Sequence, residues 1–208
     1  MSDEHLVFVV DDDQAMRASL QWLIESVGMA VRTFDSANAF LAAYEPSWFG
    51  CLLLDVRMPG MSGLELQAYL ARRDIRLPVI VITGHGDIAM AVKAMKAGAV
   101  DFIEKPFNDE DLLSSIRNAL RHDEQQRALH ARRADIAARL EELTPREHEV
   151  MTMVTDGKSN KEIAAALGVS AKTVEVHRAR VMDKMRADSL AELVRMVMLV
   201  EGETGRLG

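Results

Sequence analysis

The sequence predicts an α/β fold built on a five-stranded, doubly wound parallel sheet, followed by a helical linker and a smaller four-helix, all-α domain. Short apolar runs alternate with segments of helical apolar spacing through residues 6–120. The apolar runs are nearly continuous, which is typical of parallel strands covered by helices on both faces. Beyond residue 143 these runs disappear and helical patterns remain.

The strands are expected at the apolar runs and the helices in the segments between them. The five expected strands cover residues 6–10, 30–34, 51–54, 79–82 and 100–103. Helical spacing of apolar residues follows the first strand, and Ser36 begins the second helix. The later helices are expected at 64–73, at about 87–97, and after Asn108, which has the character of an N-cap.

Residues 121–143 are charged, alanine-rich and free of glycine and proline. A narrow apolar stripe runs through them, formed by Leu129, Ile136, Leu140 and Leu143. This pattern predicts a helical linker at 123–138, between a first domain at 4–122 and a second at 139–204. A solvated helix that rests on a neighbouring domain and a short two-chain coiled coil both fit the stripe.

Four helices are expected in the second domain, beginning near residues 145, 160, 171 and 190. Three pairs have the spacing of a capping box, in which a hydroxyl and a glutamate cap a helix start reciprocally: Thr144 with Glu147, Ser159 with Glu162, and Ser189 with Glu192. The apolar positions of these helices suffice for one compact core.

Charge and composition narrow the class of protein. The 208 residues carry a net charge of −7, of which −6 falls in residues 1–122, −1 in 123–143 and none in 144–208. The acidity argues against nonspecific nucleic-acid binding by the whole chain, although the second domain can still present a basic face. An acidic N-terminus, no long apolar stretch and a single cysteine, Cys51, predict a cytoplasmic protein without a membrane segment.

Polar side chains follow four of the expected strands. Asp11 and Asp12 follow the first, Asp55 the third, Thr83 the fourth and Lys105 the fifth. The carboxyl ends of parallel strands meet at one edge of the sheet, where ligands bind. Crowded carboxylates stay ionised only if a cation joins them, and hard oxygen ligands favour Mg²⁺. These residues predict a magnesium site at which a carboxylate accepts a phosphoryl group.

A hydroxyl and an ammonium at this edge would hold the transferred group. Thr83 and Lys105 supply them, and Lys105 precedes Pro106, so that the peptide bond between them can be cis. A cis bond there would aim the lysine over the site.

These motifs resemble the receiver domain of two-component systems, which has a flavodoxin-like fold, over residues 4–122. The resemblance is carried by Asp11-Asp12, the segment Asp55 to Gly63, Thr83-Gly84-His85-Gly86, and Lys105-Pro106-Phe107. The stretch from Ala94 to Phe107 resembles the FixJ subfamily in particular.

The resemblance implies a role for each residue of the site. Asp55 would become 4-aspartylphosphate, and Thr83 and Lys105 would contact its phosphoryl group. Mg²⁺ would be bound directly by Asp12 and Asp55, through water by Asp11, and by the backbone carbonyl of Arg57.

The receiver resemblance also implies a switch. Thr83 and Phe102 would form the switch pair. They would alter the face of the fourth helix and fifth strand that dimerises, which carries Met90, Val92, Met95 and Lys96.

Residues 159–178 read as a helix, a tight turn containing Gly168 and a second helix, which is the helix-turn-helix arrangement. With Thr144-Pro145-Arg146-Glu147, this unit resembles the LuxR-type DNA-binding domain over residues 139–204. The resemblance makes 171–186 the recognition helix, which would lie in the major groove of double-stranded DNA. Expected to face bases are Thr173, Glu175, Val176, Ala179 and Arg180; expected to hold phosphates are Lys161, Lys172, Arg178 and Lys184.

Together these features predict a transcription factor that a sensor histidine kinase phosphorylates. Its phosphorylated form would dimerise on two-fold half-sites and act with RNA polymerase, without being a turnover enzyme. The FixJ resemblance suggests control of nitrogen fixation or of microaerobic genes.

Two alternatives remain open. One is a regulator that binds DNA independently of phosphorylation and uses its first domain as a protein dock. The other is a Mg²⁺-dependent phosphotransferase or phosphatase with an aspartyl intermediate. Against it, haloacid-dehalogenase-type enzymes place their nucleophile after the first strand, whereas Asp55 follows the third.

Overall fold

The computed structural model describes residues 6–84 and 88–204. The chain divides into two compact units, one up to Gln126 and the other from Arg127 on. Within the described ranges, no helix combines the length and apolar character needed to cross a membrane.

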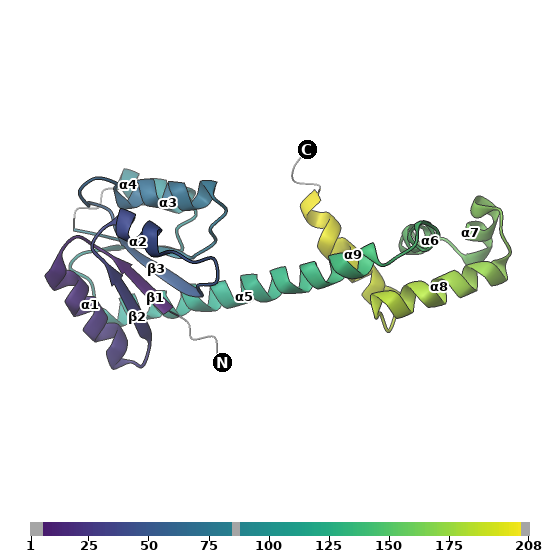
Figure 1. Cartoon of the computed structure of the whole chain (residues 1–208), viewed down its shortest axis with the longest axis horizontal. Coiled ribbons are helices and arrows are strands. Elements are labelled where there is room, and N and C mark those ends of the chain that lie inside the picture. Colours follow the sequence, from purple (N-terminus) through teal and green to yellow (C-terminus); the bar gives the residue numbers. More distant parts are fainter. Residues whose placement is uncertain (1–5, 85–87, 205–208) are drawn as a thin grey trace. The chain divides into compact units, whose positions relative to one another are not determined.

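The first unit alternates strands and helices (Figure 1). Its strands are β1 (Leu6–Val10), β2 (Ala30–Phe34), β3 (Gly50–Asp55), β4 (Val79–Thr83) and β5 (Asp101–Glu104). Its helices are α1 (Gln14–Ser26), α2 (Ala37–Ala43), α3 (Gly63–Arg72), α4 (Ile88–Lys96) and the first part of α5 (Asp109–Glu141), whose residues from Arg127 on belong to the second unit. The strands pair in parallel in the order β2-β1-β3-β4-β5. The predicted five-stranded parallel sheet is therefore confirmed, with element ends that shift by one or two residues. The expected start of the fourth helix at Asp87 lies outside the described residues, as do His85 and Gly86.

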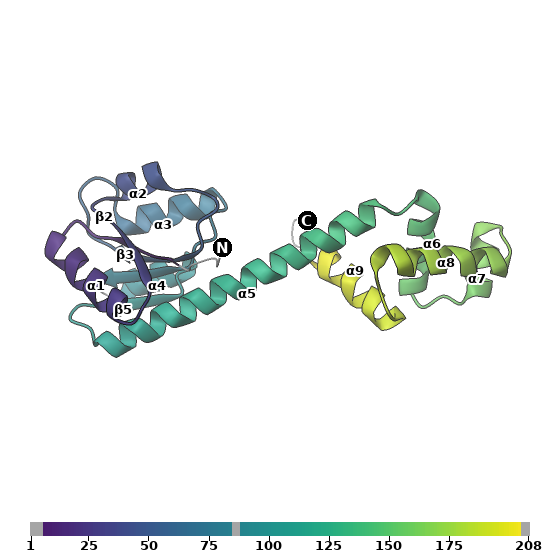
Figure 2. The ribbon, with the colours of Figure 1, turned by 60° about the horizontal axis from the view of Figure 1, so that its bottom comes forward.

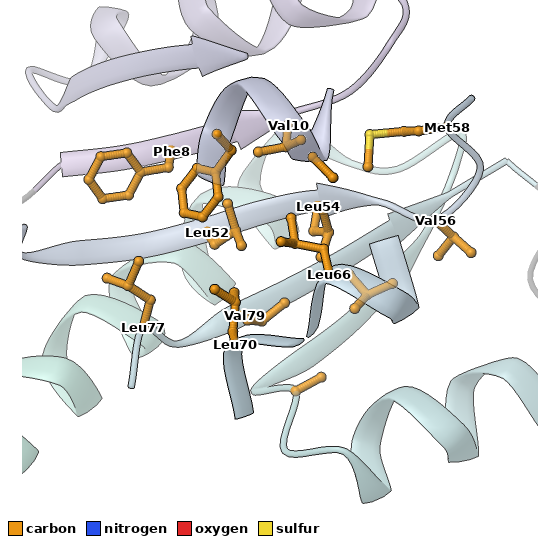
Figure 3. Packing of buried hydrophobic residues seen from close by; sticks show 14 of the residues in the cluster. Phe8, Val10, Leu52, Leu54, Val56, Met58, Leu66, Leu70, Leu77 and Val79 are labelled. Carbon is orange, nitrogen blue, oxygen red and sulfur yellow. The ribbon is translucent and has the colours of Figure 1, made fainter. Parts of the chain in front are cut away.

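Successive side chains on each strand point to opposite faces of the sheet, so each face packs against its own layer of helices. Phe8, Val10, Leu52 and Leu54 pack toward α2, α3 and α4 (Figure 3). The alternate residues, Val7, Val9, Cys51 and Leu53, pack toward α1 and α5. Both faces are therefore buried, as the near-continuous apolar strands predict.

Helix α5 is longer than the sequence pattern suggests. It runs from Asp109 to Glu141 and includes the expected linker, because neither glycine nor proline interrupts the span. Its start is capped by Asn108, whose side chain accepts a hydrogen bond from the Glu110 N–H at 2.8 Å. Ile136 near its end is buried in the core of the second unit, and Leu140 packs against the same core.

The second unit adds α6 (Pro145–Thr155), α7 (Asn160–Leu167), α8 (Ala171–Met185) and α9 (Leu190–Thr204) (Figure 2). All four predicted starts are confirmed. Thr144 and Ser159 form complete capping boxes with Glu147 and Glu162. At α9 the expected box differs, because the Glu192 carboxylate accepts from the N–H of Asp188 rather than of Ser189.

Gly63 at the start of α3 lies against the strand that carries Asp55. A Cβ built at Gly63 would lie 2.1 Å from the backbone oxygen of Asp55. We therefore expect Gly63→Ala to lower the free energy of unfolding by about 1–3 kcal/mol, the usual cost of overpacking. Urea unfolding of the full chain measures this, with Gly84→Ala as the control because a Cβ there meets nothing within 4 Å. Equal midpoints for the two variants would contradict the expected clash.

Candidate functional site

Four strand ends meet at one edge of the sheet. Asp11 follows β1, Asp55 ends β3, Thr83 ends β4 and Lys105 follows β5, and these strands are successive neighbours. The Lys105 N–H donates to the Thr83 carbonyl at 2.7 Å, so the pairing of the last two strands extends to the site. The Lys105–Pro106 peptide bond is cis.

The Lys105 ammonium joins the two buried carboxylates of the site. Its Nζ donates to Asp55 Oδ1 at 2.7 Å and to Asp11 Oδ2 at 2.8 Å. The second oxygen of each carboxylate accepts from a backbone N–H: Asp55 Oδ2 from Arg57 at 2.7 Å, and Asp11 Oδ1 from Asp13 at 2.8 Å. Asp55 and Asp11 are only 7% and 3% exposed, so both are fixed in a largely dry environment.

The charges at this edge depend on one another. Burial raises the pKa of Asp55, and the nearby Asp11 charge adds to that shift, while Lys105 and the Arg57 N–H oppose it. Burial alone would lower the pKa of Lys105, but its hydrogen bonds to Asp11 and Asp55 outweigh burial and raise it. Ionised Asp55 therefore relies on a cation at its side.

The predicted magnesium ligands come together only in part. Among the described residues, no three Asp, Glu, His or Cys side chains are grouped as around a metal ion, and Asp12 is exposed. Asp11 and Asp55 nevertheless direct oxygens at one shared cation, the Lys105 ammonium. Hard carboxylate oxygens that converge on one positive charge fit the donor preference of Mg²⁺.

The predicted switch and dimer residues occupy different environments. Thr83 is buried, and Phe102 is partly buried against the core that α2, α3 and α4 share. On α4, Val92 and Met95 are 45% and 48% exposed, and Lys96 is exposed as well. Met90 instead packs against the core, whereas Ile88, which the pattern did not single out, is 85% exposed.

The second unit contains the predicted helix-turn-helix in α7 and α8. Gly168 ends α7 in the left-handed conformation with φ 66°, and Ser170 caps α8 by accepting from the Thr173 N–H at 3.0 Å. Arg178 of α8 donates to the Asn160 side-chain oxygen at 2.7 Å, which ties the second helix to the start of the first.

Most of the residues predicted to contact DNA are exposed, as a contact surface requires. They are Lys161, Lys172, Glu175, Val176, Ala179 and Arg180, all in the second unit. Thr173 is half-buried and its hydroxyl hydrogen-bonds that of Ser170 at 2.8 Å. Lys184 is engaged inside the unit, because its ammonium donates to Glu147 at 2.7 Å and to the Glu142 carbonyl at 3.0 Å.

The sequence pattern did not single out two groups that the structure places at these sites. Arg17 donates to the backbone carbonyls of Asp11 and Asp12. Arg146 donates to the Leu167 carbonyl at 2.6 Å, at the turn between α7 and α8. Arg17 could have been noticed from the sequence, because it is a basic residue one helical turn after the expected helix cap Asp13.

Known families match both units. Residues 7–117 match the family described as "Response regulator receiver domain", and residues 141–197 match "Bacterial regulatory proteins, luxR family". The transcriptional regulatory protein FixJ of Bradyrhizobium diazoefficiens is 48% identical over 95% of this chain and 97% of its own length. The chain belongs to the FixJ-type response regulators. It is accordingly a transcription regulator, and its two domains imply a histidine kinase partner and DNA binding.

Other relatives of this FixJ-type regulator carry different names. Nodulation protein W of B. diazoefficiens is 49% identical over 94% of this chain and 86% of its own, and TodT of Pseudomonas putida is 46% identical over 94% and 87%. Among solved structures, the response regulator StyR matches with a TM-score of 0.83 and 44% identity over 93% of this chain and 98% of that one. Full-length FixJ from B. japonicum matches with a TM-score of 0.58 and 46% identity over 96% and 98%.

The pair of Glu147 and Lys184 predicts a pH dependence of the second unit. The Lys184 hydrogen bond, together with the Thr144 N–H, lowers the pKa of Glu147 to about 2 from its ordinary 4.5. A lowered pKa in the folded state stabilises the fold above pH 4.5, and this stabilisation is lost as the pH falls toward 2. In Glu147→Gln that part of the acid sensitivity should be absent.

Urea midpoints of the full chain at several pH values between 7 and 3, followed through the amide NMR signals of α6, measure this difference. The control is Glu149→Gln, which removes an exposed carboxylate of the same helix. If Glu147→Gln keeps the acid sensitivity of the wild type, the ion pair does not carry it.

Proposed function

We propose that Asp55 accepts a phosphoryl group from a sensor histidine kinase and that this step controls how the regulator assembles and binds DNA. The observation that carries the proposal is the Lys105 ammonium, which lies 2.7 Å from Asp55 and 2.8 Å from Asp11 at the carboxyl edge of the sheet. A buried carboxylate next to a fixed cation and a hydroxyl is a suitable nucleophile for a dianionic phosphoryl group.

In the proposed transfer, an Asp55 carboxylate oxygen attacks phosphorus and the bond from phosphorus to the kinase histidine nitrogen breaks. The electron pair of that bond stays on the imidazole, which takes up a proton. Lys105 and Thr83 would contact the phosphoryl oxygens. Asp11, Asp12, Asp55 and the Arg57 carbonyl would hold Mg²⁺, which neutralises the phosphoryl oxygens when bound.

Phosphorylation would then act on the switch pair. An aspartyl phosphate adds a dianion at a place where Lys105 already balances two carboxylates. We expect Lys105 and the Thr83 hydroxyl to turn toward the phosphoryl group and Phe102 to move further inward. The α4–β5 face would change with them, and its exposed Val92, Met95 and Lys96 would form the dimer contact together with Met90.

In the second unit, α8 would enter the major groove and dimers would read two half-sites related by two-fold symmetry. Thr173, Glu175, Val176, Ala179 and Arg180 would face bases, while Lys161, Lys172 and Arg178 would hold phosphates, which contributes affinity but no sequence choice. Since Lys184 already pairs with Glu147, we assign it to the support of α8 rather than to phosphate contact. RNA polymerase would be the next partner, in the cytoplasm.

The dimerisation proposal predicts a change of molar mass. Beryllofluoride with Mg²⁺, which mimics the phosphoryl group, should convert the full chain from monomer to dimer because it occupies the place of the phosphate on Asp55. Asp55→Asn should stay monomeric, and Asp35→Asn, an exposed aspartate outside the site, should dimerise like the wild type. Light scattering at several protein concentrations measures this. Dimerisation of Asp55→Asn under the same conditions would refute Asp55 as the acceptor.

Base reading by α8 predicts unequal effects of two exposed arginines. On duplexes selected from a random pool by the wild type, Arg180→Ala should lose about 1–3 kcal/mol of binding free energy and tolerate changes in the bases that it reads. Arg195→Ala, an exposed arginine of α9, should bind within about 0.5 kcal/mol of the wild type. Fluorescence anisotropy at fixed salt distinguishes them, and equal losses would mean that Arg180 supplies charge alone.

A further inference from the structure

Arg17 of α1 reaches back to the strand end that carries the acidic residues. Its Nη1 donates to the carbonyl oxygen of Asp11 at 2.7 Å and to that of Asp12 at 3.0 Å. The side chain is half-buried, and the Arg17 backbone N–H donates to the Asp13 carbonyl at 3.0 Å. One guanidinium nitrogen thus holds two successive peptide groups of the β1–α1 turn.

The side chains of this turn have contacts of their own. The Asp11 carboxylate is bound by Lys105 and by the Asp13 N–H, and the Asp13 carboxylate caps α1 through the N–H of Ala15 at 2.8 Å. The side chains thus fix the directions of Asp11 and Asp13, and Arg17 fixes the peptide groups of Asp11 and Asp12. Rotation of those peptide groups would change the direction of the exposed Asp12 side chain relative to that of Asp11.

We propose that Arg17 is a positioning residue for phosphoryl transfer: by holding the Asp11 and Asp12 carbonyls, it fixes the backbone that carries the two acidic side chains of the proposed Mg²⁺ site. This inference rests on the proposed function of Asp55. Arg17 acts here through the backbone of Asp11 and Asp12 and not through their carboxylates.

The positive charge of Arg17 alone would have the opposite effect. A cation beside a site for Mg²⁺ repels the metal, so removal of the charge should tighten metal binding. Loss of positioning should weaken it. The sign of the change in Mg²⁺ affinity therefore separates the two roles.

The experiment measures Mg²⁺ binding to the full chain by isothermal titration calorimetry, without any phosphoryl donor. We expect Arg17→Gln to weaken binding about 10-fold, the usual effect of losing a partner that orients metal-binding groups. Arg17→Lys keeps the charge and a donor on a side chain of different length and geometry, and should fall between Arg17→Gln and the wild type. The matched control is Arg121→Gln, because this exposed arginine of α5 donates to Asn118 and should leave the affinity unchanged.

Two further readouts guard against a merely unfolded variant. Urea midpoints of the Arg17 variants show whether the domain is intact, and amide hydrogen exchange should be faster at residues 11–13 without a comparable change in β3. An Arg17→Gln variant that binds Mg²⁺ as tightly as the wild type, or more tightly, would overturn the positioning role.

The outcome also separates this inference from the proposed function. Phosphorylation by acetyl phosphate is followed in parallel for the wild type, Asp55→Asn and Arg17→Gln. If the wild type neither binds Mg²⁺ nor takes up phosphate at Asp55, the proposed function fails and the inference fails with it. If the wild type does both and Arg17→Gln matches it in metal binding, the inference alone fails.

Discussion

The Lys105 ammonium between Asp55 and Asp11 is the interaction on which the receiver site depends. Asp55 is only 7% exposed and burial raises its pKa, so its ionised form depends on the cation beside it. The parallel order β1-β3-β4-β5 brings the three groups to one edge, because Asp11 and Asp55 lie at the ends of adjacent strands and Lys105 follows β5, on the far side of β4. The chemistry at this edge therefore depends on the order of the strands in the sheet.

Much of this arrangement could be predicted because the relevant physics is local or follows from strand direction. Apolar runs predicted the strands, and the spacing of a hydroxyl residue and a glutamate predicted the starts of α6 and α7. Polar residues that follow parallel strands lie at the same edge of the sheet, which predicted the site. The pattern could not supply side-chain partners across the fold. Lys184 pairs with Glu147, 37 positions away. Met90 packs against the core, although Ile88 and Val92, two residues before and after it, are exposed.

The helical pattern of residues 121–143 was predicted, but it did not show where the preceding helix ends and the linker begins. The span from Asp109 to Glu141 lacks any residue that ends a helix, so the last helix of the first unit and the linker form one helix. Its apolar stripe has a packing role near the C-terminal end, because Ile136 is buried in the core of the second unit. There Arg139 donates to the Met185 carbonyl at 3.0 Å, at the end of α8. These contacts favour a helix that rests on a domain over a coiled-coil seam.

The helix contacts also explain how a second domain with no net charge can present a basic face. Two of its glutamates lie at helix starts, where Glu147 and Glu162 accept from backbone N–H groups of their capping boxes. Such acids balance the positive ends of helices. On α8 itself, the exposed Glu175 pairs with Lys172 at 3.0 Å. Lys184 compensates the buried Glu147, while Lys172 and Arg180 of α8 remain exposed. Because part of the acidic charge is used at helix starts, exposed basic residues of α8 such as Arg180 can attract phosphates locally although the domain has no net charge.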